Sequence, residues 1–387
     1  MVRAAAAQPG VPRLLRVLND RNTLELMLAD GAMTRAELGR RTGVSRVTAS
    51  EALGRLQARG LVDVVGRRSA GPGPDAEVYA VHPGVGRALG IDVRADSVAM
   101  AVGAVTGETL TTVVDDSPSL AVAERVERAV AAVLEACSSA GDDVLAAVAA
   151  VPGVVDPGTH DIRFSHDLPD APLGLREQLE ARLGAPVVLE NDGNAAAVAE
   201  GAVGVAVGCS DVVVVWLGEG IGCACVVDGR LHRGSSGAAG EIGYLPVPGA
   251  RLPEHLDRTT EGPYLRLVGV PALAEVVGAP AGAVAAAVRT ASGAVLDEVA
   301  RRVALGVASV CSGLDPELVV LSGEIGVAGG ERLAGLVADH VGRLAPVRPV
   351  VTASTLGESA VLEGATRCAV LSARQSLVAR LSGPADE

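Results

Sequence analysis

The sequence predicts an α/β protein in which a small helix-turn-helix domain precedes a larger body, and three observations lead to this fold class. A chain of 387 residues is too long for one hydrophobic core, so two or three domains are expected. Helix caps and apolar spacing in the first 82 residues predict three short helices and two strands. Farther along, a β-meander over residues 212–232 repeats one that begins at residue 88, which suggests a weak internal duplication of the body.

Composition and charge exclude several functions. Aromatic residues make up only 1% of the chain, too few for a stacking platform that binds single-stranded nucleic acid. All 33 basic residues are arginines, which excludes a P-loop lysine, a Schiff base and a catalytic lysine. Residues 1–82 hold 12 arginines and 8 acidic residues and so carry a net charge of +4. The whole chain carries −13, so the remaining residues together carry −17. A basic head on an acidic body is typical of a DNA-binding domain joined to a part that does not touch DNA.

The cysteines and the apolar runs bear on the cellular compartment. The six cysteines are scattered, with no spacing that indicates a disulfide framework. Cys223 and Cys225 share one face of a predicted strand, where two core thiols are a simpler interpretation than half of a metal site. The longest apolar run, residues 144–155, is shorter than the roughly 18 residues that a membrane helix needs. With no signal-peptide pattern, we expect a cytoplasmic protein with no membrane partner.

The first 82 residues carry helix signals in the order of a helix-turn-helix. A first helix is expected over residues 19–29, capped by the Asn-Asp pair at its start. Thr34 and Glu37 form a capping box for a second helix, Gly43 ends that helix, and Ser45 caps a third. The apolar positions with the spacing of the buried seam are Leu38, Val44, Ala49, Leu53 and Leu56.

The segment after the third helix predicts a wing. Residues 61–65 and 77–81 are two expected strands, joined by a loop rich in glycine and arginine. The exposed start of the third helix is the end that enters the major groove in such domains. The predicted DNA-contacting residues are Ser45, Arg46, Thr48, Ser50, Arg67 and Arg68. The alternative is a three-helix bundle followed by a flexible linker.

The stretch from Trp216 to Val247 is the centre of the body. Two strand-forming runs flank the glycine-rich turn Leu217–Gly222, in which the backbone can approach a ligand and point its amides at an anion. A tight hairpin with no ligand explains the turn alone equally well. The following segment, residues 237–243, is more specific, because it places the single carboxylate of Glu241 among small residues, as a sugar hydroxyl requires.

These motifs, in this order, resemble the ROK family of repressors, open reading frames and sugar kinases, over residues 87–387. The resemblance implies an actin-like, ribonuclease-H-like ATPase fold, with two α/β lobes and a cleft between them. We therefore expect a winged helix-turn-helix domain over residues 1–82 and a ROK domain over residues 83–387. Within the latter, lobe 1 should cover about 87–190 plus a C-terminal helix over about 357–387, and lobe 2 about 191–356. ROK sugar kinases usually lack the winged domain that ROK repressors carry.

The resemblance also implies a sugar site. Gly153 lies in a turn similar to the family's PGxxD motif, and Asn191 and Asp192 follow a predicted strand. In ROK kinases this aspartate takes the proton from the sugar hydroxyl; here it is interpreted as a vestigial base position, and no catalytic residue is expected. A simple helix-capping role is the alternative for Asp192. The implied sugar-binding residues are Gly153, Asn191, Asp192, Glu241 and Tyr244, the last standing where the family has histidine.

The implied nucleotide site departs from the family pattern. The positions concerned are Asp92, Gly218, Glu219, Gly220 and Gly323. Glu219 replaces a threonine, and Arg94-Ala95-Asp96 stand in place of the phosphate-binding Gly-Gly-Thr. A carboxylate about 4 Å from a phosphate oxygen costs on the order of several kcal/mol at an effective dielectric near 20. We therefore predict a degenerate nucleotide site without ATP–Mg²⁺.

The family's zinc motif is absent as well, because residues 245–262 contain no cysteine, so we expect no metal and no cofactor. The resulting hypothesis is a sugar-responsive transcriptional regulator, a repressor of carbohydrate genes, with a duplex DNA operator, a small sugar or sugar-derivative effector and a homodimeric assembly. The first alternative is an active ROK sugar kinase that phosphorylates a hexose with ATP. The second is a repressor that no longer binds an effector.

Overall fold

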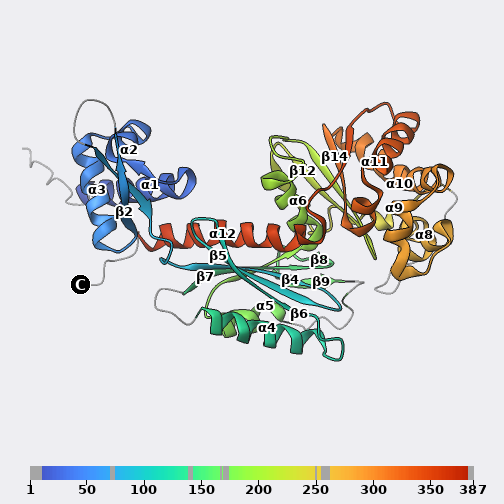
Figure 1. Cartoon of the computed structure of the whole chain (residues 1–387), viewed down its shortest axis with the longest axis horizontal. Coiled ribbons are helices and arrows are strands. Elements are labelled where there is room, and N and C mark those ends of the chain that lie inside the picture. The colour runs from blue at the N-terminus through green and yellow to red at the C-terminus, as the bar shows by residue number, and fades with distance from the viewer. Residues whose placement is uncertain are drawn as a thin grey trace, which may run out of the picture.

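The protein is described by a computed structural model that covers residues 11–69, 75–137, 143–165, 168, 174–248, 251–253 and 262–381 (Figure 1). An N-terminal winged domain is joined to two α/β lobes, as the sequence predicts. The winged domain consists of α1 (Val11–Asp30), β1 (Met33–Thr34), α2 (Arg35–Thr42), α3 (Arg46–Ala58), β2 (Val62–Arg68) and β3 (Ala76–Val81).

The predicted helix-turn-helix is present. The Thr34 side chain accepts a hydrogen bond from the backbone of Glu37, whose carboxylate reaches back to the Thr34 backbone, so the capping box forms. Gly43 adopts a left-handed conformation with φ of 73°, which ends α2 without the strain that a side chain would add. Ser45 caps α3 by accepting from the backbone N–H of Thr48 at 3.1 Å. The tip of the predicted wing, residues 70–74, lies outside the described residues.

The expected start of the first helix is wrong. The helix begins at Val11 rather than at the Asn-Asp pair, and Asp20 lies inside it. The Asp20 carboxylate does not cap a helix, because it accepts hydrogen bonds from Nε and Nη2 of Arg55 on α3, at 3.0 and 2.6 Å. Local sequence favoured a cap at this position, and a partner 35 residues away uses the side chain instead.

The two lobes have the same topology. In the first, the strands are β4 (Arg87–Val93), β5 (Val98–Ala104), β6 (Thr109–Asp115), β7 (Val144–Val151) and β10 (Val187–Asn191), arranged in the order β10-β7-β4-β5-β6. In the second, they are β11 (Val212–Leu217), β12 (Ile221–Val227), β13 (Arg230–His232), β14 (Leu318–Ser322) and β15 (Val350–Ala353), arranged as β13-β12-β11-β14-β15. Each sheet combines an antiparallel meander with two parallel strands, so the suggested duplication extends to the whole lobe.

Two helices fill the junction between the sheets. Helix α6 (Asp192–Val203) follows β10, and α12 (Ala360–Arg380) returns from the second lobe to cover one face of the first sheet (Figure 1). Helices α4 (Val122–Ala136) and α5 (Leu175–Leu183) cover the opposite face. Where α12 crosses α6, Gly364 lies so close that a Cβ atom would stand 1.8 Å from the carbonyl oxygen of Ala195. This contact packs α12 closely against α6.

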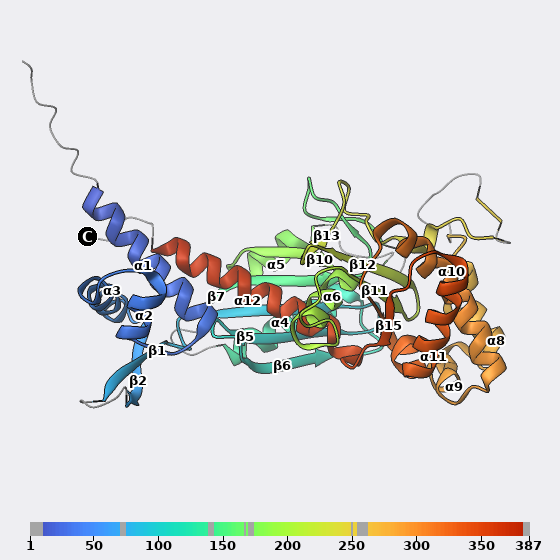
Figure 2. The same ribbon diagram turned by 90° about the horizontal axis from the view of Figure 1, so that it is seen from above.

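The winged domain shares a hydrophobic core with the first lobe. Buried side chains of α1, including Leu24 and Met27, belong to the same apolar cluster as Leu377, Val378 and Leu381 at the end of α12. Seen from above, α12 runs along the sheet to the winged domain (Figure 2). The winged domain is therefore packed on the body at the end of α12, a helix that also packs against α6.

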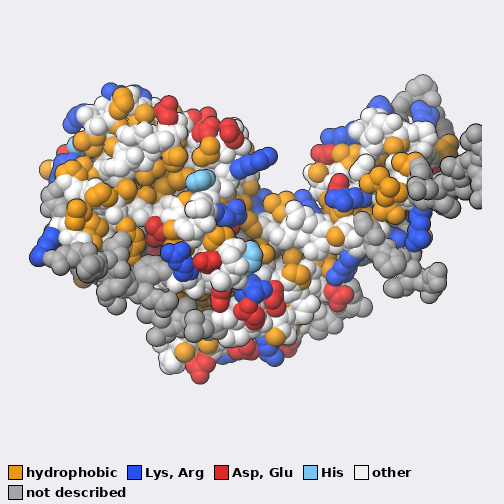
Figure 3. Space-filling view, turned by 180° about the vertical axis from the view of Figure 1, so that it is seen from behind, with side chains coloured by type: hydrophobic (Ala, Val, Ile, Leu, Met, Phe, Trp, Pro, Cys, Tyr) orange, Lys and Arg blue, Asp and Glu red, His pale blue; other side chains and the backbone are white. Residues whose placement is uncertain are grey.

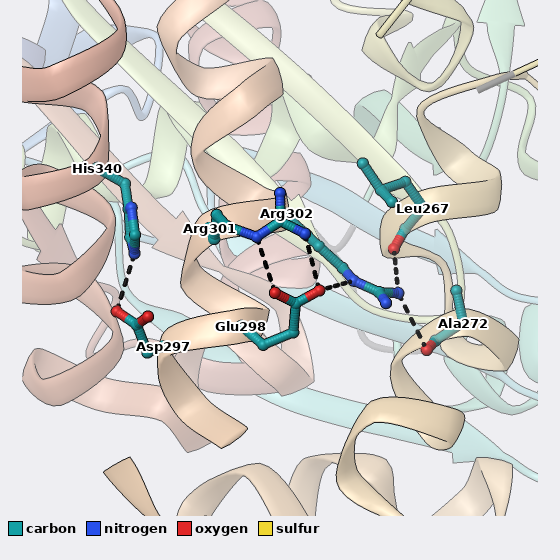
Figure 4. A network of polar contacts seen from close by, with 7 residues as sticks. All are labelled: Leu267, Ala272, Asp297, Glu298, Arg301, Arg302 and His340. Carbon is teal, nitrogen blue, oxygen red and sulfur yellow. Dashed lines mark hydrogen bonds and ion pairs between the residues drawn. The ribbon is translucent and has the colours of Figure 1, made fainter. Parts of the chain in front are cut away.

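The second lobe carries additional helices on its outer side, α7 (Leu265–Val268), α8 (Val270–Val277), α9 (Val284–Thr290), α10 (Gly293–Leu314) and α11 (Gly323–Leu344). Figure 4 shows a polar network that links α10 to its neighbours. Glu298 pairs with Arg301 and Arg302, and Arg302 donates to the carbonyl oxygens of Leu267 and Ala272.

Among the described residues no single helix is long and apolar enough to cross a membrane; one pair, Leu265–Val277 and Ala281–Thr290, meets that test together but is bent by 84°.

Glu298→Gln is expected to destabilise the protein by less than about 1 kcal/mol at pH 7, because the pair is partly exposed and screened. Hydrogen bonds from Arg301, and then from Arg302, lower the pKa of Glu298 from 4.5 to about 2. A lowered pKa adds stability above pH 4.5, and that stability is lost as the pH falls through about 2. The unfolding free energies of the wild type and of Glu298→Gln are measured in urea between pH 7 and pH 3. The difference between them should shrink only in the acid range. A difference that is constant with pH would contradict the assignment.

Candidate functional site

A cavity of about 220 Å³ lies between the two lobes and contains both halves of the predicted site. The five predicted sugar residues all line it, as do four of the predicted nucleotide positions, Asp92, Gly218, Glu219 and Gly220. Gly323 does not line the cavity; it lies so close to Leu217 that a Cβ atom would stand 2.5 Å from the carbonyl oxygen of that residue. The neighbouring Glu324 does line the cavity. The sequence motifs therefore converge on one cavity from separate turns.

Asn191 organises the part of the cavity that holds the predicted sugar residues. Its Oδ1 accepts the backbone N–H of Asn194 at 3.0 Å and so caps α6, while its Nδ2 donates to the carbonyl oxygen of Gly153 at 3.0 Å. The end of β10 is thereby tied to the turn after β7. The open question about Asp192 is answered by this geometry: Asn191 is the cap of α6, and Asp192 is the first residue of the helix, on the cavity wall.

The turn that carries Glu241 is held by close backbone contacts. A Cβ atom on Gly240 would stand 1.7 Å from the carbonyl oxygen of Cys223, and one on Gly237 would stand 2.0 Å from that of Val155 in the first lobe. Both glycines have positive φ, 95° and 78°, which a side chain would strain. The turn therefore fits against β12 on one side and against the first lobe on the other. Glu241 is presented to the cavity at this contact between the lobes.

Several carboxylates line the part of the cavity that holds the predicted nucleotide positions. Asp92 is buried, and burial raises its pKa, while the guanidinium of Arg94 counteracts this from 2.9 Å. Arg94 also donates to the carbonyl oxygen of Glu358, just before α12. Asp96, Glu219 and Glu324 line the same space. Burial raises the pKa of Glu324, and the nearby charges of Glu358 and Glu219 raise it further.

Sequence reasoning missed the role of Arg94 in the cavity and that of Glu190, which adjoins the cavity residue Asn191 without lining the cavity. Arg94 was noted only as a departure from the phosphate turn, yet it neutralises Asp92 and connects that turn to the start of α12. Glu190 was also overlooked. Its carboxylate is buried, accepts from Nδ2 of Asn194 at 2.9 Å, and pairs with Arg233 of the second lobe at 2.5 Å. The available signal for this bridge between the lobes was that Glu190 is an acidic residue at the end of a strand, four residues before an asparagine.

Helix α3, which carries Arg46, Thr48 and Ser50, lies on the side of the winged domain away from the lobes (Figure 1). Basic side chains are visible on the surface of the winged domain (Figure 3). Arg46, Ser50 and Arg67 are exposed. Ser45 and Thr48 bond to each other at the start of α3, so their hydroxyls are partly used by the helix itself. Arg68 is exposed and pairs with Glu37 at 3.1 Å. The described part of the chain contains no group of three or more metal-binding side chains arranged to hold a metal ion.

Two protein-family models match the chain: the ROK family over residues 88–263 and the MarR family over residues 13–72. The bifunctional enzyme NanE/NanK of Brucella suis is 34% identical over 203 residues, 51% of this chain and 37% of that protein. The glucokinase of Streptomyces coelicolor is 30% identical over 161 residues, 42% of this chain and 50% of that protein. The chain thus spans about a third to a half of the length of these relatives. The xylose repressor of Bacillus subtilis is 24% identical over 240 residues, 60% of this chain and 61% of the repressor.

Solved structures agree on the fold. A ROK family transcriptional regulator, described as a homologue of the Escherichia coli MLC protein, superposes with a TM-score of 0.71 at 17% identity, over 95% of this chain and all of that one. A ROK glucokinase from Streptomyces griseus, in complex with glucose and AMPPNP, gives a TM-score of 0.58 at 26% identity, over 73% of this chain and 99% of that one. The chain therefore combines a winged domain that matches the MarR family over residues 13–72 with a following domain that matches the ROK family over residues 88–263.

Proposed function

We propose that this protein is a sugar-responsive, DNA-binding transcriptional regulator that represses carbohydrate genes. One observation carries the proposal: α12 begins in the wall of the cavity, where Val361 lines it, and ends in the core that it shares with the winged domain. A change of lobe closure around a sugar can therefore move the DNA-binding domain. Xylose repressors are among the relatives, and the glucokinase structure matches a smaller share of the chain than the regulator does.

The sugar-binding part of the proposal rests on Gly153, Asn191, Asp192, Glu241 and Tyr244. These residues come from separate segments and meet in one cavity. Carboxylates accept hydrogen bonds from neighbouring hydroxyls, which is what a monosaccharide offers. Binding between lobes favours one closure angle, and typical coupling of this kind changes affinity by roughly 5–150-fold.

The DNA-binding part assumes a homodimer that reads an inverted repeat, with half-sites about one helical turn or a multiple apart. Leu14, Leu15 and Leu18 on α1 are exposed apolar side chains close in sequence, a surface suited to contact with a second copy. Sedimentation of the purified protein tests the dimer.

Arg46→Ala tests DNA binding directly. We expect about tenfold weaker binding to the operator at 0.15 M salt, because loss of one phosphate contact removes one released counterion and lowers the salt slope by about 1. Arg230→Ala, on exposed β13 of the second lobe, is the matched control and should bind like the wild type. Operators can be obtained by selection from random duplexes. Equal effects of both substitutions on affinity and salt slope would contradict the assignment.

We propose further that the ROK domain is not an enzyme and uses no cofactor or metal. Asp96, Glu219 and Glu324 occupy the half of the cavity in which a nucleotide phosphate would lie, and Arg94 is already paired with Asp92. The second candidate function, an ATP-dependent sugar kinase, is favoured by the persistence of Asp192 and by the kinases among the relatives.

Incubation of the protein with ATP, Mg²⁺ and a hexose mixture is expected to yield no sugar phosphate above background. The physical reason is repulsion between the cavity carboxylates and the triphosphate. A coupled assay, with a hexokinase as positive control, measures this. Turnover near about 1 per second, the low end for kinases, would establish the kinase instead.

A further inference from the structure

The recognition helix presents a stripe of residues that the predicted DNA contacts leave out. At 3.6 residues per turn, Val47, Glu51, Gly54 and Ala58 follow one line along α3. All four are exposed, and they lie opposite the buried face formed by Ala49, Ala52, Leu53 and Leu56. Arg46 and Ser50 stand on the flank of this stripe. In a helix-turn-helix, the side of the second helix that faces away from its own core is the side that faces the base pairs.

Val47 is an unusual residue for this position. It is 68% exposed, and among the described residues no large apolar side chain is more exposed. It occupies the first turn of α3, next to the cap formed by Ser45. A β-branched residue adds nothing to the stability of an exposed helix. In the major groove, however, the C5 methyl group of thymine is the apolar feature that distinguishes bases, and small apolar side chains contact it.

Glu51 lies one turn farther along the stripe. Its nearest basic neighbour on α3, Arg55, is hydrogen-bonded to Asp20, and no ion pair to Glu51 occurs among the described residues. A carboxylate facing DNA is repelled by phosphates unless it accepts a hydrogen bond from a base, and the N4 amino group of cytosine is the donor in the major groove. Beyond Glu51, Gly54 has no atom within 4 Å of the position of a Cβ, which leaves room for close approach of the duplex.

We propose that Val47 and Glu51 determine operator specificity, with Val47 packed against the methyl group of a thymine and Glu51 accepting a hydrogen bond from N4 of a cytosine. The two residues are about 6 Å apart along the helix axis, close to the rise of two base pairs. This inference rests on the proposed function of the protein as a DNA-binding regulator. To that function the inference adds which bases the protein recognises. The arginines contact phosphates and set the overall affinity.

The test begins with selection of duplexes from a random pool by the full-length protein. In the selected half-site, each thymine is replaced in turn by deoxyuridine, which removes only the methyl group. We expect one position per half-site at which this replacement weakens wild-type binding about fourfold, the factor that burial of one methyl group corresponds to. Val47→Ala should bind thymine and deoxyuridine at that position alike. Glu51→Gln should lose about tenfold of the preference for a neighbouring C·G pair.

The outcomes separate the inference from the proposed function. If the wild type selects no duplex, the proposed function as a DNA-binding regulator is wrong, and this inference is wrong with it. If the wild type selects a site but Val47→Ala keeps the full deoxyuridine penalty, the thymine contact is wrong while DNA binding stands. If Glu51→Gln selects the same bases with the same discrimination, the cytosine contact is wrong. Gln57→Ala, exposed on α3 but outside both the stripe and the predicted DNA contacts, serves as the control and should leave both preferences unchanged.

Discussion

Asp192→Ala is expected to lower the affinity for the effector sugar about 100-fold. The Asp192 carboxylate lines the cavity at the first residue of α6, and its Oδ1 accepts a hydrogen bond from the backbone N–H of Gly193 at 2.8 Å. Hydrogen bonds from sugar hydroxyls to a charged group contribute about 1.5–3 kcal/mol each, so loss of one or two accounts for the factor. Calorimetry with xylose and glucose, the sugars in the names of the repressor and the glucokinase among the relatives, identifies the ligand and measures the change.

Glu219→Gln provides the matched control for this experiment. Glu219 is a carboxylate in the same cavity, but it lies in the turn of the nucleotide half. We expect it to leave the affinity for a neutral sugar unchanged within about threefold, since no phosphate is bound. If Asp192→Ala binds the sugar as tightly as the wild type, the sugar site lies elsewhere. If both variants lose binding equally, the loss reflects the charge of the cavity rather than a contact with Asp192.

The sequence was most informative where the chemistry is local. The capping box of Thr34 and Glu37 and the left-handed Gly43 depend on residues three to five positions apart, so they could be predicted without tertiary knowledge. The family resemblance then placed Asn191 and Glu241, whose turns do meet in the cavity. Fold and candidate site were accessible to this extent because short motifs impose short-range geometry.

Two of the failures share one physical cause, competition from distant partners. Asp20 resembles a helix cap in sequence, but Arg55 takes its carboxylate. Arg94 joins Glu358 across 264 residues, and no periodicity indicates such a contact. The stripe of Val47 on α3 was hidden for a different reason, because exposure of an apolar residue becomes visible only once the buried face of the helix is known.

Leu381→Ala is expected to uncouple sugar binding from DNA binding, while each ligand is still bound. Leu381 follows the last turn of α12 and is 3% exposed, in the core shared with α1 of the winged domain. Truncation of Leu381 leaves a cavity where α12 packs on the winged domain, and this destabilises the contact by about 2–5 kcal/mol. Movement of α12 would then no longer position the winged domain. Leu371→Ala, on the same helix but 55% exposed, is the matched control.

Operator affinity measured with and without sugar decides the prediction. In the wild type and in Leu371→Ala the sugar should change operator affinity by roughly 5–150-fold, and in Leu381→Ala by less than about threefold. Because coupling between two ligands is reciprocal, saturating operator must change sugar affinity by the same factor in each protein, which gives an independent measurement. Thermal unfolding checks that Leu381→Ala remains folded. Undiminished coupling in that folded variant would show that the signal reaches the winged domain by a route other than the end of α12.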